Sequence, residues 1–261
     1  MAKINKRSTL QIWGDVIFAI FLREIKSNFS DKFGISWALI SPMIMITAMV
    51  LIRNPFDGGD THGMPTVFFV VFGVVLVQFF LGTFEKTANA IQKNKPLYAF
   101  RQVQPISSVL AIGGFELVNK IALVVLLTLL AYFFQMEMKM ADPLALIFTV
   151  IRVWFLAVAL GTIFSLAACY VPEVQKIKVI ITRPMFFISG IFFSLQDIPT
   201  EYWPYLIWNP LLHAIELARF EAYPPYGSLG VSEFYLDIST LVAVTFALCC
   251  YQISWKQAIS R

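Results

Sequence analysis

The sequence predicts an all-α integral membrane protein with six membrane-spanning helices, and three observations lead to this fold class. Of 261 residues, 58% are hydrophobic and 14% are charged, whereas soluble domains are about 45–50% apolar and about 25% charged. Uncharged stretches recur along the chain and can supply the roughly 20 apolar residues that a spanning helix needs. Lys and Arg gather in alternate connections between these stretches. The composition excludes an ordinary soluble enzyme, a disordered chain and a disulfide-rich secreted module.

An amphipathic helix is expected before the first span, within residues 1–34. On a helix, Arg23 and Lys26 fall within one narrow polar arc, and apolar residues cover most of the remainder. Such a helix lies in the inner membrane interface with its basic side toward anionic headgroups. Glu24 falls on the apolar side, so it either has a specific polar partner or is a solvated charge at a frayed edge. Gly34 is expected to end this helix.

The spans follow from the charge-free stretches. They are placed at residues 35–53, 65–85, 106–134, 143–171, 177–196 and 237–255. The third contains Glu116 and Lys120, and the fourth contains Arg152. The fifth is the weakest, because basic residues occupy its first third and the remaining apolar run is too short to cross alone. The segment at about 200–221, rich in Trp, Tyr and Pro, has the length of short re-entrant helices between spans five and six.

The orientation follows from the basic residues, which stay on the cytoplasmic side of spans. With the N-terminus inside, fifteen of the 20 Lys and Arg residues fall in cytoplasmic segments and three on the other side. Both termini are therefore expected in the cytoplasm, which requires an even number of spans. One transmembrane domain, 35–257, precedes a cytoplasmic tail, 258–261. The net charge of +4 conceals a basic inner face and an acidic outer face, so it does not indicate nucleic-acid binding.

No catalytic constellation is found in the sequence. Two histidines cannot make a histidine metal cluster, and no G-x-x-x-x-G-K-[ST] phosphate loop is present. We therefore expect no catalytic residue, metal or cofactor on this chain, and any ATP-driven work must come from another chain. Gly113, Gly114 and Gly161 are expected to be positions where helices pack closely, since small residues let helices approach each other in lipid.

Charged residues inside spans are costly and usually face a bundle interior or a water-filled path. Glu116 and Lys120 have the i,i+4 spacing that pairs them on one helix face, either as a structural ion pair or as the lining of an inward entrance. Arg152 lies about 15 Å of helix rise beyond Asp142, near mid-membrane, with no acid nearby in sequence. An anionic substrate, a partner helix or backbone carbonyls could neutralise it.

The longest inner connection, residues 85–105, is basic and amphipathic. Residues 87–98 could form a short helix with Ile91, Leu97 and Tyr98 available to enter a groove on a soluble partner. The alternative is a surface helix that touches only headgroups. Because the chain has no motor domain, docking to a partner is the favoured hypothesis.

Aromatic residues crowd the segment between spans five and six, where prolines interrupt the helix. They include Phe187, Phe193, Tyr202, Trp203 and Trp208. Aromatic belts at membrane interfaces account for part of this pattern. The remainder indicates broken helices lining a path, because irregular backbone at membrane depth survives only against protein or water. Flat aromatic faces also suit sugar rings.

These features together resemble the ABC-2 type permeases, in particular those of bacterial capsular polysaccharide exporters. The stretch F-L-R-E-I-K at 21–26, with F-G-x-x-W at 33–37 and S-P at 41–42, is similar to the family's interface helix and entrance to the first span. The segment W-N-P-L-x-H-x-I-E-x-x-R at 208–219 is similar to its signature after the fifth span. The resemblance covers nearly the whole chain.

In that family two permease copies pair with two copies of a separate ATPase, which binds ATP and Mg, and the complex moves a lipid-linked glycan. The resemblance therefore implies a homodimeric, multi-pass permease of the bacterial inner membrane. Gram-negative capsule exporters also engage a periplasmic co-polymerase and an outer-membrane channel. The implied ATPase-coupling residues are Arg23, Glu24, Lys26, Ile91, Leu97 and Tyr98. The expected substrate-pathway residues are Glu116, Lys120, Arg152, Phe187, Phe193, Tyr202, Trp203, Trp208, Asn209, His213, Glu216 and Arg219.

Three alternatives remain open at this point. The chain could be an ABC-2 permease for O-antigen, teichoic acid or a small drug. It could be an integral-membrane glycosyl- or acyltransferase, although the scattered acids argue against a carboxylate cluster at one membrane face. It could also be a membrane scaffold that transports nothing.

Overall fold

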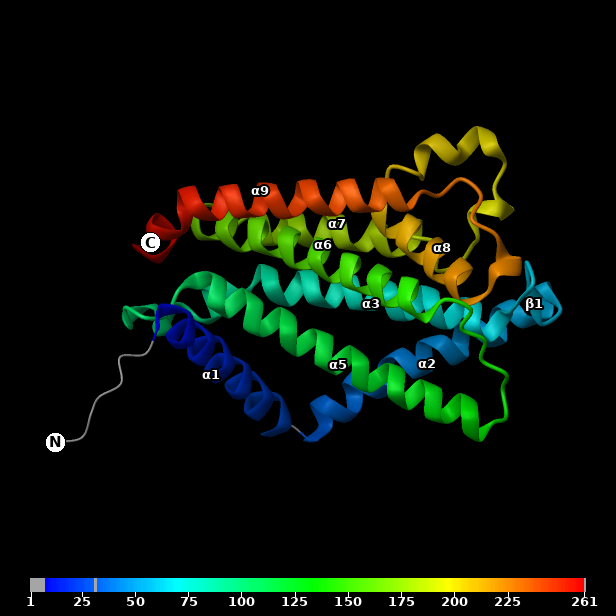
Figure 1. The fold of residues 1–261 in the computed structure, drawn as a ribbon, viewed down its shortest axis with the longest axis horizontal. Coiled ribbons are helices and arrows are strands. Elements are labelled where there is room, and N and C mark those ends of the chain that lie inside the picture. Colours follow the sequence, from blue (N-terminus) through cyan, green and yellow to red (C-terminus); the bar gives the residue numbers. More distant parts are fainter. Residues whose placement is uncertain (1–7, 31, 261) are drawn as a thin grey trace.

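The computed structural model describes residues 8–30 and 32–260 as a bundle of helices with one small hairpin, which confirms the all-α fold class (Figure 1). The α-helices are α1 (Thr9–Ser30), α2 (Lys32–Asp57), α3 (Thr66–Ala88), α4 (Ala90–Lys93), α5 (Pro105–Phe133), α6 (Pro143–Tyr170), α7 (Val174–Ile188), α8 (Pro210–Ala222) and α9 (Glu233–Ser260). The 3-10 helices are η1 (Lys95–Ala99), η2 (Leu195–Asp197), η3 (Thr200–Tyr205) and η4 (Pro224–Tyr226). Strands β1 (Asp60–Thr61) and β2 (Met64–Pro65) pair antiparallel.

Helix α3 forms the centre of the bundle. It packs against α2, α5 and α6, and α6 packs in turn against α9. Its sequence is apolar on every side, which is the pattern of a helix buried all round rather than on one stripe. Valine and phenylalanine side chains of α3 are the largest contribution of any helix to the main hydrophobic core.

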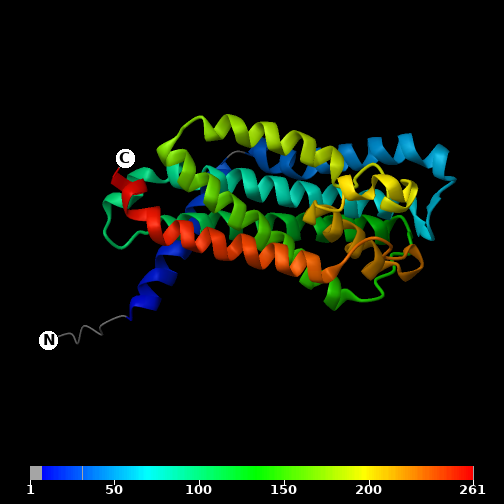
Figure 2. The same cartoon turned by 90° about the horizontal axis from the view of Figure 1, so that it is seen from above.

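Within the residues that the structure describes, five helices are long and apolar enough to cross a membrane: residues Leu39–Asp57 of α2, then α3, α5, α6, and residues Glu233–Ala258 of α9. Helix α7 runs lengthwise beside this group (Figure 2) but has only 15 residues. At 1.5 Å per residue it covers about 22 Å, less than the roughly 30 Å of a hydrocarbon core. It ends before Gly190, whose φ of 80° turns the chain. The helix at the place of the predicted fifth span, 177–196, is therefore shorter than expected, and both this span and the count of six stay predictions.

The N-terminal helix is confirmed as a separate element, but its end was placed wrongly. Helix α1 ends at Ser30 and α2 begins at Lys32, so Gly34 lies inside α2 and does not terminate α1. Helix α1 slants across one end of the bundle and packs on α5 (Figures 1 and 2). Its position at a membrane interface remains a prediction.

Two of the three glycines expected at close helix contacts are confirmed there. A Cβ on Gly161 would lie 1.8 Å from the Thr87 Oγ1, and one on Gly113 would lie 2.9 Å from the Val158 Cγ2. Both glycines therefore let α6 and its neighbours α3 and α5 approach more closely than a side chain allows. Gly114 is different, because a Cβ there would meet nothing within 4 Å.

The connections are sorted onto the two ends of the bundle. The α3–α5 and α6–α7 connections and the C-terminal part of α9 lie at one end, here called the inner end (Figure 1). The hairpin, the α5–α6 connection and α8 lie at the other, here called the outer end. These names follow the charge-based prediction, which assigns the same connections to the same sides.

Candidate functional site at the two ends of the bundle

At the inner end, Glu24 of α1 has specific partners. Its side chain is buried, with 4% of the residue exposed. Its Oε2 lies 2.7 Å from the Lys93 Nζ, and its Oε1 lies 3.3 Å from the Arg23 Nη2. Arg23 also donates a hydrogen bond to the Asn94 side chain. The partner hypothesis for Glu24 is confirmed, the frayed-edge alternative is wrong, and α1 is thereby tied to the α3–α5 connection.

The apolar residues of this connection face inward. Ile91 is 1% exposed, and its N–H donates to the Ser165 Oγ at 3.1 Å. Tyr98 is also buried, and Leu97 is half-buried. Ile91 and Tyr98 belong to a second hydrophobic core at the inner end. The expectation that they are free to enter a partner's groove is therefore wrong, because the chain's own helices α5 and α6 already cover them.

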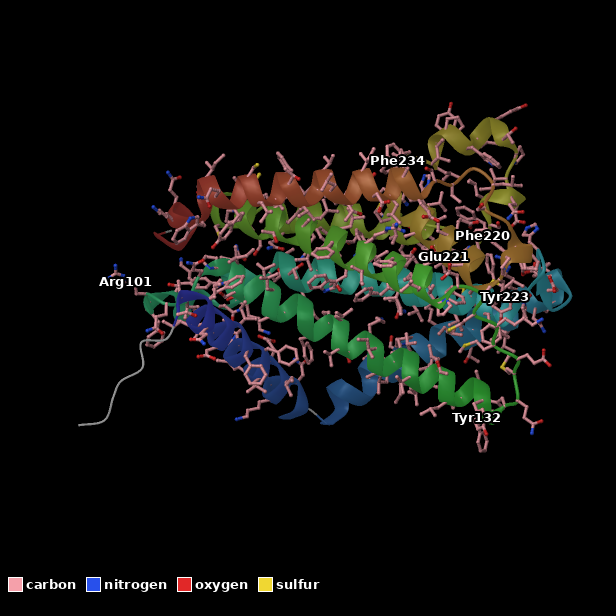
Figure 3. All side chains as sticks on the ribbon, in the orientation of Figure 1. Arg101, Tyr132, Phe220, Glu221, Tyr223 and Phe234 are labelled. Atoms are coloured by element: carbon pink, nitrogen blue, oxygen red, sulfur yellow. The ribbon has the colours of Figure 1, made fainter. Side chains whose placement is uncertain are left out.

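The exposed surface of the inner end carries several basic side chains and the aromatic ring of Phe100. Lys26, Lys93, Lys95 and Arg101 are exposed there, and so is Phe100. Figure 3 shows Arg101 pointing away from the bundle at this end. A soluble partner can reach these side chains, whereas Ile91 and Tyr98 are buried and cannot be reached.

Glu116 of α5 is buried, but its partner comes from another helix. Its Oε1 lies 2.5 Å from the Nζ of Lys86 on α3. The Lys86 ammonium also lies 5.8 Å from the centre of the Phe115 ring. The predicted pairing of Glu116 with Lys120 is thus replaced by a link between α3 and α5. Lys120 lies half-buried one turn further along α5.

Arg152 is neutralised from a helix that is remote in sequence. Its Nε lies 2.7 Å from the Asp237 Oδ1, and its Nη2 lies 3.9 Å from the Glu233 Oε2. Both acids stand at the start of α9. A partner helix, α9, therefore supplies the negative charge next to Arg152, which was one of the three alternatives expected from the sequence.

At the outer end, Glu216 and Arg219 form an ion pair inside the protein. Arg219 is 0% exposed, and its Nη1 lies 2.9 Å from the Glu216 Oε1. Its Nη2 donates to the backbone oxygens of Phe69 and Gly190 at 3.1 and 2.8 Å. The Tyr226 hydroxyl donates to the Glu216 Oε2 at 2.8 Å. In this structure both residues fix α8 against α3 and do not line an open path.

Asn209 and His213 are equally enclosed. Asn209 is the N-cap of α8, since its side chain accepts from the Leu211 N–H at 3.0 Å, and Pro210 occupies the first position of the helix. The His213 Nδ1 accepts from the Ser232 N–H at 3.0 Å, and the Nε2 lies 2.7 Å from a backbone oxygen. The N-P-L-x-H part of the motif therefore starts and anchors the short helix.

The aromatic residues of this end divide into two groups. Phe187, Tyr202 and Trp208 are exposed, whereas Phe193 and Trp203 are half-buried. The exposed rings can meet lipid or a passing chain, and their assignment to the pathway remains a prediction.

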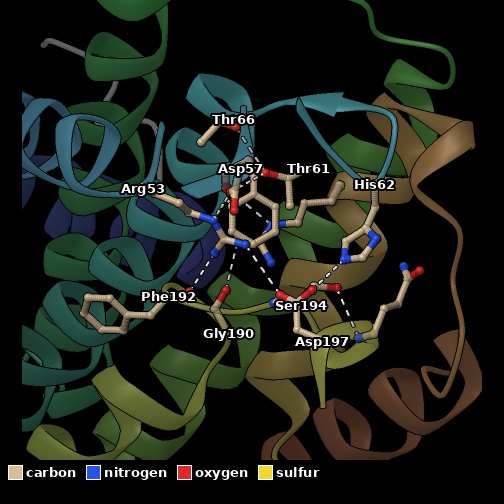
Figure 4. A network of polar contacts seen from close by, with 12 residues as sticks. Arg53, Asp57, Thr61, His62, Thr66, Gly190, Phe192, Ser194 and Asp197 are labelled. Carbon is tan, nitrogen blue, oxygen red and sulfur yellow. Dashed lines mark hydrogen bonds and ion pairs between the residues drawn. The ribbon is translucent and has the colours of Figure 1, made fainter. Parts of the chain in front are cut away.

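A polar network that the sequence did not reveal joins three segments of the outer end (Figure 4). Arg53, at the end of α2, pairs with Asp57 and donates to the Phe192 backbone oxygen at 2.6 Å. Its Nη2 lies 3.5 Å from the Asp197 Oδ2, and the His62 Nε2 lies 2.7 Å from the Asp197 Oδ1. We call Arg53, His62 and Asp197 the outer latch. It connects α2, the hairpin turn and η2.

Asp197 is held in its charged form. Burial alone would raise the pKa of this carboxyl. Hydrogen bonds from the Ser194 N–H and from His62, together with the charge of Arg53, outweigh burial and lower its pKa below the ordinary value of 3.8. No pattern in a single sequence pairs Arg53 with Asp197, because 144 positions separate them.

Comparisons with known proteins agree with this architecture. The ABC-2 type transporter family matches residues 15–221. The polysialic acid transport protein KpsM of Escherichia coli is 34% identical over 251 residues, covering 94% of this chain and 96% of that protein. The capsule polysaccharide export inner-membrane protein CtrC of Neisseria meningitidis serogroup B is 24% identical, covering 95% of each chain. BexB of Haemophilus influenzae, with the same description, is 24% identical and covers 91% of this chain and 93% of its own. The resemblance expected from the two motifs is confirmed, and the chain belongs to the ABC-2 type transporter family.

Proposed function

We propose that this chain is the permease subunit of an ATP-driven exporter that moves lipid-linked capsular polysaccharide across the inner membrane. The observation that carries the proposal is the 34% identity to a polysialic acid transport protein along 94% of the chain. Two other relatives named for capsule polysaccharide export match at similar coverage. The five apolar helices supply the membrane part of such a machine.

The motor of this exporter is a separate ATPase that binds ATP and Mg and docks at the inner end. The exposed basic residues and Phe100 form the docking surface. Glu24 gives this surface a mechanical connection, because its ion pair with Lys93 links α1 directly to the α3–α5 connection. A displacement of α1 or of the α3–α5 connection by the ATPase would therefore also displace α5, against which α1 packs.

The pathway is formed with a second copy of the chain. Helices α2 and α9 bury only a small part of their apolar residues within one copy, so extensive surface is left for a second. In this proposal Lys120 attracts an anionic glycan from the inner side, and the exposed rings Phe187, Tyr202 and Trp208 contact it at the outer end. A periplasmic co-polymerase and an outer-membrane channel receive the glycan beyond the acidic outer connections.

Deleting the gene in the organism that encodes it tests this function. The proposal predicts that capsular polysaccharide disappears from the cell surface and accumulates inside the cell, and that the wild-type gene restores export. Quantifying glycan in the surface and intracellular fractions separates export from synthesis. Loss of both fractions would indicate a biosynthetic enzyme, and unchanged surface glycan would overturn the proposal.

A further inference from the structure

A cavity of about 350 Å³ lies between α2, α3, α5 and the start of α6, in the outer half of the bundle. Apolar side chains form nearly all of its wall, and its two hydroxyl groups belong to Thr47 and Thr128. The Thr128 hydroxyl is already used, since it donates to the Val124 backbone oxygen of its own helix. All four helices around the cavity are apolar enough to cross a membrane. In a membrane, helices of this kind bring lipid hydrocarbon close to the cavity.

A segment without regular secondary structure, residues 136–140, lies between this cavity and a hollow on the outer surface. Its side chains alternate between these two spaces, as they do along a strand. Its methionines line the cavity, whereas Glu137 and Lys139 line a hollow of about 560 Å³ on the other side, whose wall mixes charged and apolar side chains. The methionines are Met136, Met138 and Met140, and the last borders both spaces.

The segment is held in place from the end of α8. The Tyr223 hydroxyl accepts from the Lys139 N–H at 3.1 Å and donates to the Glu137 backbone oxygen at 3.3 Å. Figure 3 shows Tyr223 at the outer end of the bundle, where these segments meet. The hollow also contains Asp60, so its rim carries two carboxylates and one ammonium group. An apolar cavity thus adjoins a rim that carries charges of both signs.

An apolar cavity of this size favours a hydrocarbon occupant. Dry apolar cavities of about 150 Å³ in proteins take up apolar ligands rather than water. A cavity more than twice as large, whose wall includes the exposed side chains of Val124 and Phe134, suits an acyl chain, and flexible methionine side chains adapt to chains of different length. The rim adds a charge argument, because a zwitterionic headgroup offers an ammonium to the two acids and a phosphate to Lys139.

We propose that this cavity binds one acyl chain of a phospholipid whose headgroup is zwitterionic, of the ethanolamine type. The ammonium lies near Asp60 and Glu137, and the phosphate lies near Lys139. The acyl chain completes the wall between α2 and α5, which matters because α2 is poorly buried by the rest of the chain. A lipid that binds only the folded protein stabilises it by mass action.

Photocrosslinking tests the cavity. The purified full chain, in detergent, is irradiated with phosphatidylethanolamine that carries a diazirine in one acyl chain, and the adducts are mapped by mass spectrometry. We expect adducts on the cavity methionines. Ala131, a buried residue of the cavity wall, is changed to Phe to fill the space. Ala131→Phe should lower the adduct yield about tenfold, the effect of about 1.4 kcal/mol of binding free energy.

The matched control is Leu129→Phe, which adds a ring to an exposed position of the same helix outside the cavity and should keep the full yield. Val124→Phe, also in the cavity wall, replaces Ala131→Phe if that variant does not fold. Unchanged yield in a folded cavity-filling variant would overturn the proposal. So would a disulfide between two copies through Ala131→Cys in place of lipid adducts, because a second chain would then occupy the cavity.

Competition tests the headgroup. Unlabelled phosphatidylethanolamine should displace the probe about fivefold better than phosphatidylglycerol, the size of one partly exposed ion pair. Glu137→Lys should reverse this order, since the rim then carries an excess of positive charge. Equal competition by the two lipids in the wild-type protein would contradict the zwitterionic assignment.

Discussion

The Glu24 Oε2 on α1 lies 2.7 Å from the Lys93 Nζ on α4, although 69 positions separate the two residues. This ion pair attaches the N-terminal helix to the α3–α5 connection, in which Lys93, Lys95 and Arg101 are exposed. In the proposed exporter, both elements face the ATPase, so the pair makes them move together.

A double-mutant cycle on Glu24→Gln and Lys93→Met measures this coupling. We expect a coupling free energy of up to about 1 kcal/mol in unfolding experiments in detergent, because the half-exposed Lys93 can be rehydrated when the carboxylate is lost. Lys26→Met, at an exposed position of the same helix as Glu24, is the control and should show no coupling to Glu24→Gln. Additive effects of Glu24→Gln and Lys93→Met would contradict the link.

The outer latch predicts a definite pH dependence. The pKa of Asp197 is lowered in the folded protein, so the carboxylate stabilises the fold above its unfolded pKa, and this contribution is lost as pH falls through the folded pKa. The difference in Tm between wild-type protein and Asp197→Asn should be constant at neutral pH and vanish below the ordinary Asp value of 3.8. At neutral pH the difference should correspond to about 1 kcal/mol, since Asp197 is partly exposed.

Thermal unfolding of both proteins over a pH series checks this prediction. His62→Gln serves as the companion variant, because it removes one partner of Asp197 and keeps the charge of Arg53. A Tm difference for Asp197→Asn that grows as the solution is acidified would contradict the stabilising role of the charged carboxylate.

Substituting Arg219 should prevent folding, and not merely abolish transport by a folded protein. Arg219→Ala leaves the Glu216 carboxylate buried without its cation, which costs about 3–5 kcal/mol. Arg219→Lys cannot restore stability, because an ammonium does not replace a guanidinium that binds two backbone oxygens and stacks on the Phe69 ring at 3.5 Å. Immunoblots of membranes should show both variants strongly depleted. A variant at normal membrane levels that has lost export would instead support direct contact with substrate.

Gly161 and Gly114 provide a matched test of helix packing. Gly161→Leu forces a side chain into Thr87 and should destabilise the α3–α6 contact by about 1–3 kcal/mol or more. Gly114→Leu adds the same side chain where nothing lies within 4 Å, so it should be nearly neutral or slightly stabilising. The two proteins are compared by their unfolding midpoints in detergent. Equal losses in both would contradict the packing described for α6.

The sequence was sufficient for the features that depend on local pattern. Apolar length and the sorting of basic residues predicted the bundle and its two ends, and the misplaced charge of Glu24 indicated a specific partner as one of two alternatives. The end of the N-terminal helix was placed wrongly at Gly34, and the other features that the sequence left open or wrong concern distance in space. The acid that pairs with Arg152 lies on α9, 85 positions away in the sequence. Ile91 was expected on the surface because a short amphipathic helix has the same sequence pattern whether its apolar side packs on its own bundle or on a partner protein.

The motif at residues 208–219 likewise contains residues whose structural role could not be predicted from the sequence. It marks the family correctly, but its polar residues are enclosed in the structure, with Arg219 at 0% exposure. Buried and substrate-binding residues can occupy the same motif, so the motif does not distinguish residues that contact substrate from residues that hold a helix in place. Only their partners, such as Phe69 and Tyr226 for Arg219 and Glu216, decide that question.

In the proposed exporter this chain is the membrane pathway of a machine whose motor is a separate protein. Translocation is measured in proteoliposomes that contain the chain and its neighbouring ATPase and are loaded with lipid-linked capsular polysaccharide. A glycan hydrolase on one side of the membrane reports the movement of the glycan. We expect ATP-dependent translocation with both proteins present and none with either protein alone. Translocation without the ATPase, or ATP hydrolysis by the pair with no glycan movement, would show that the chain is not such a pathway.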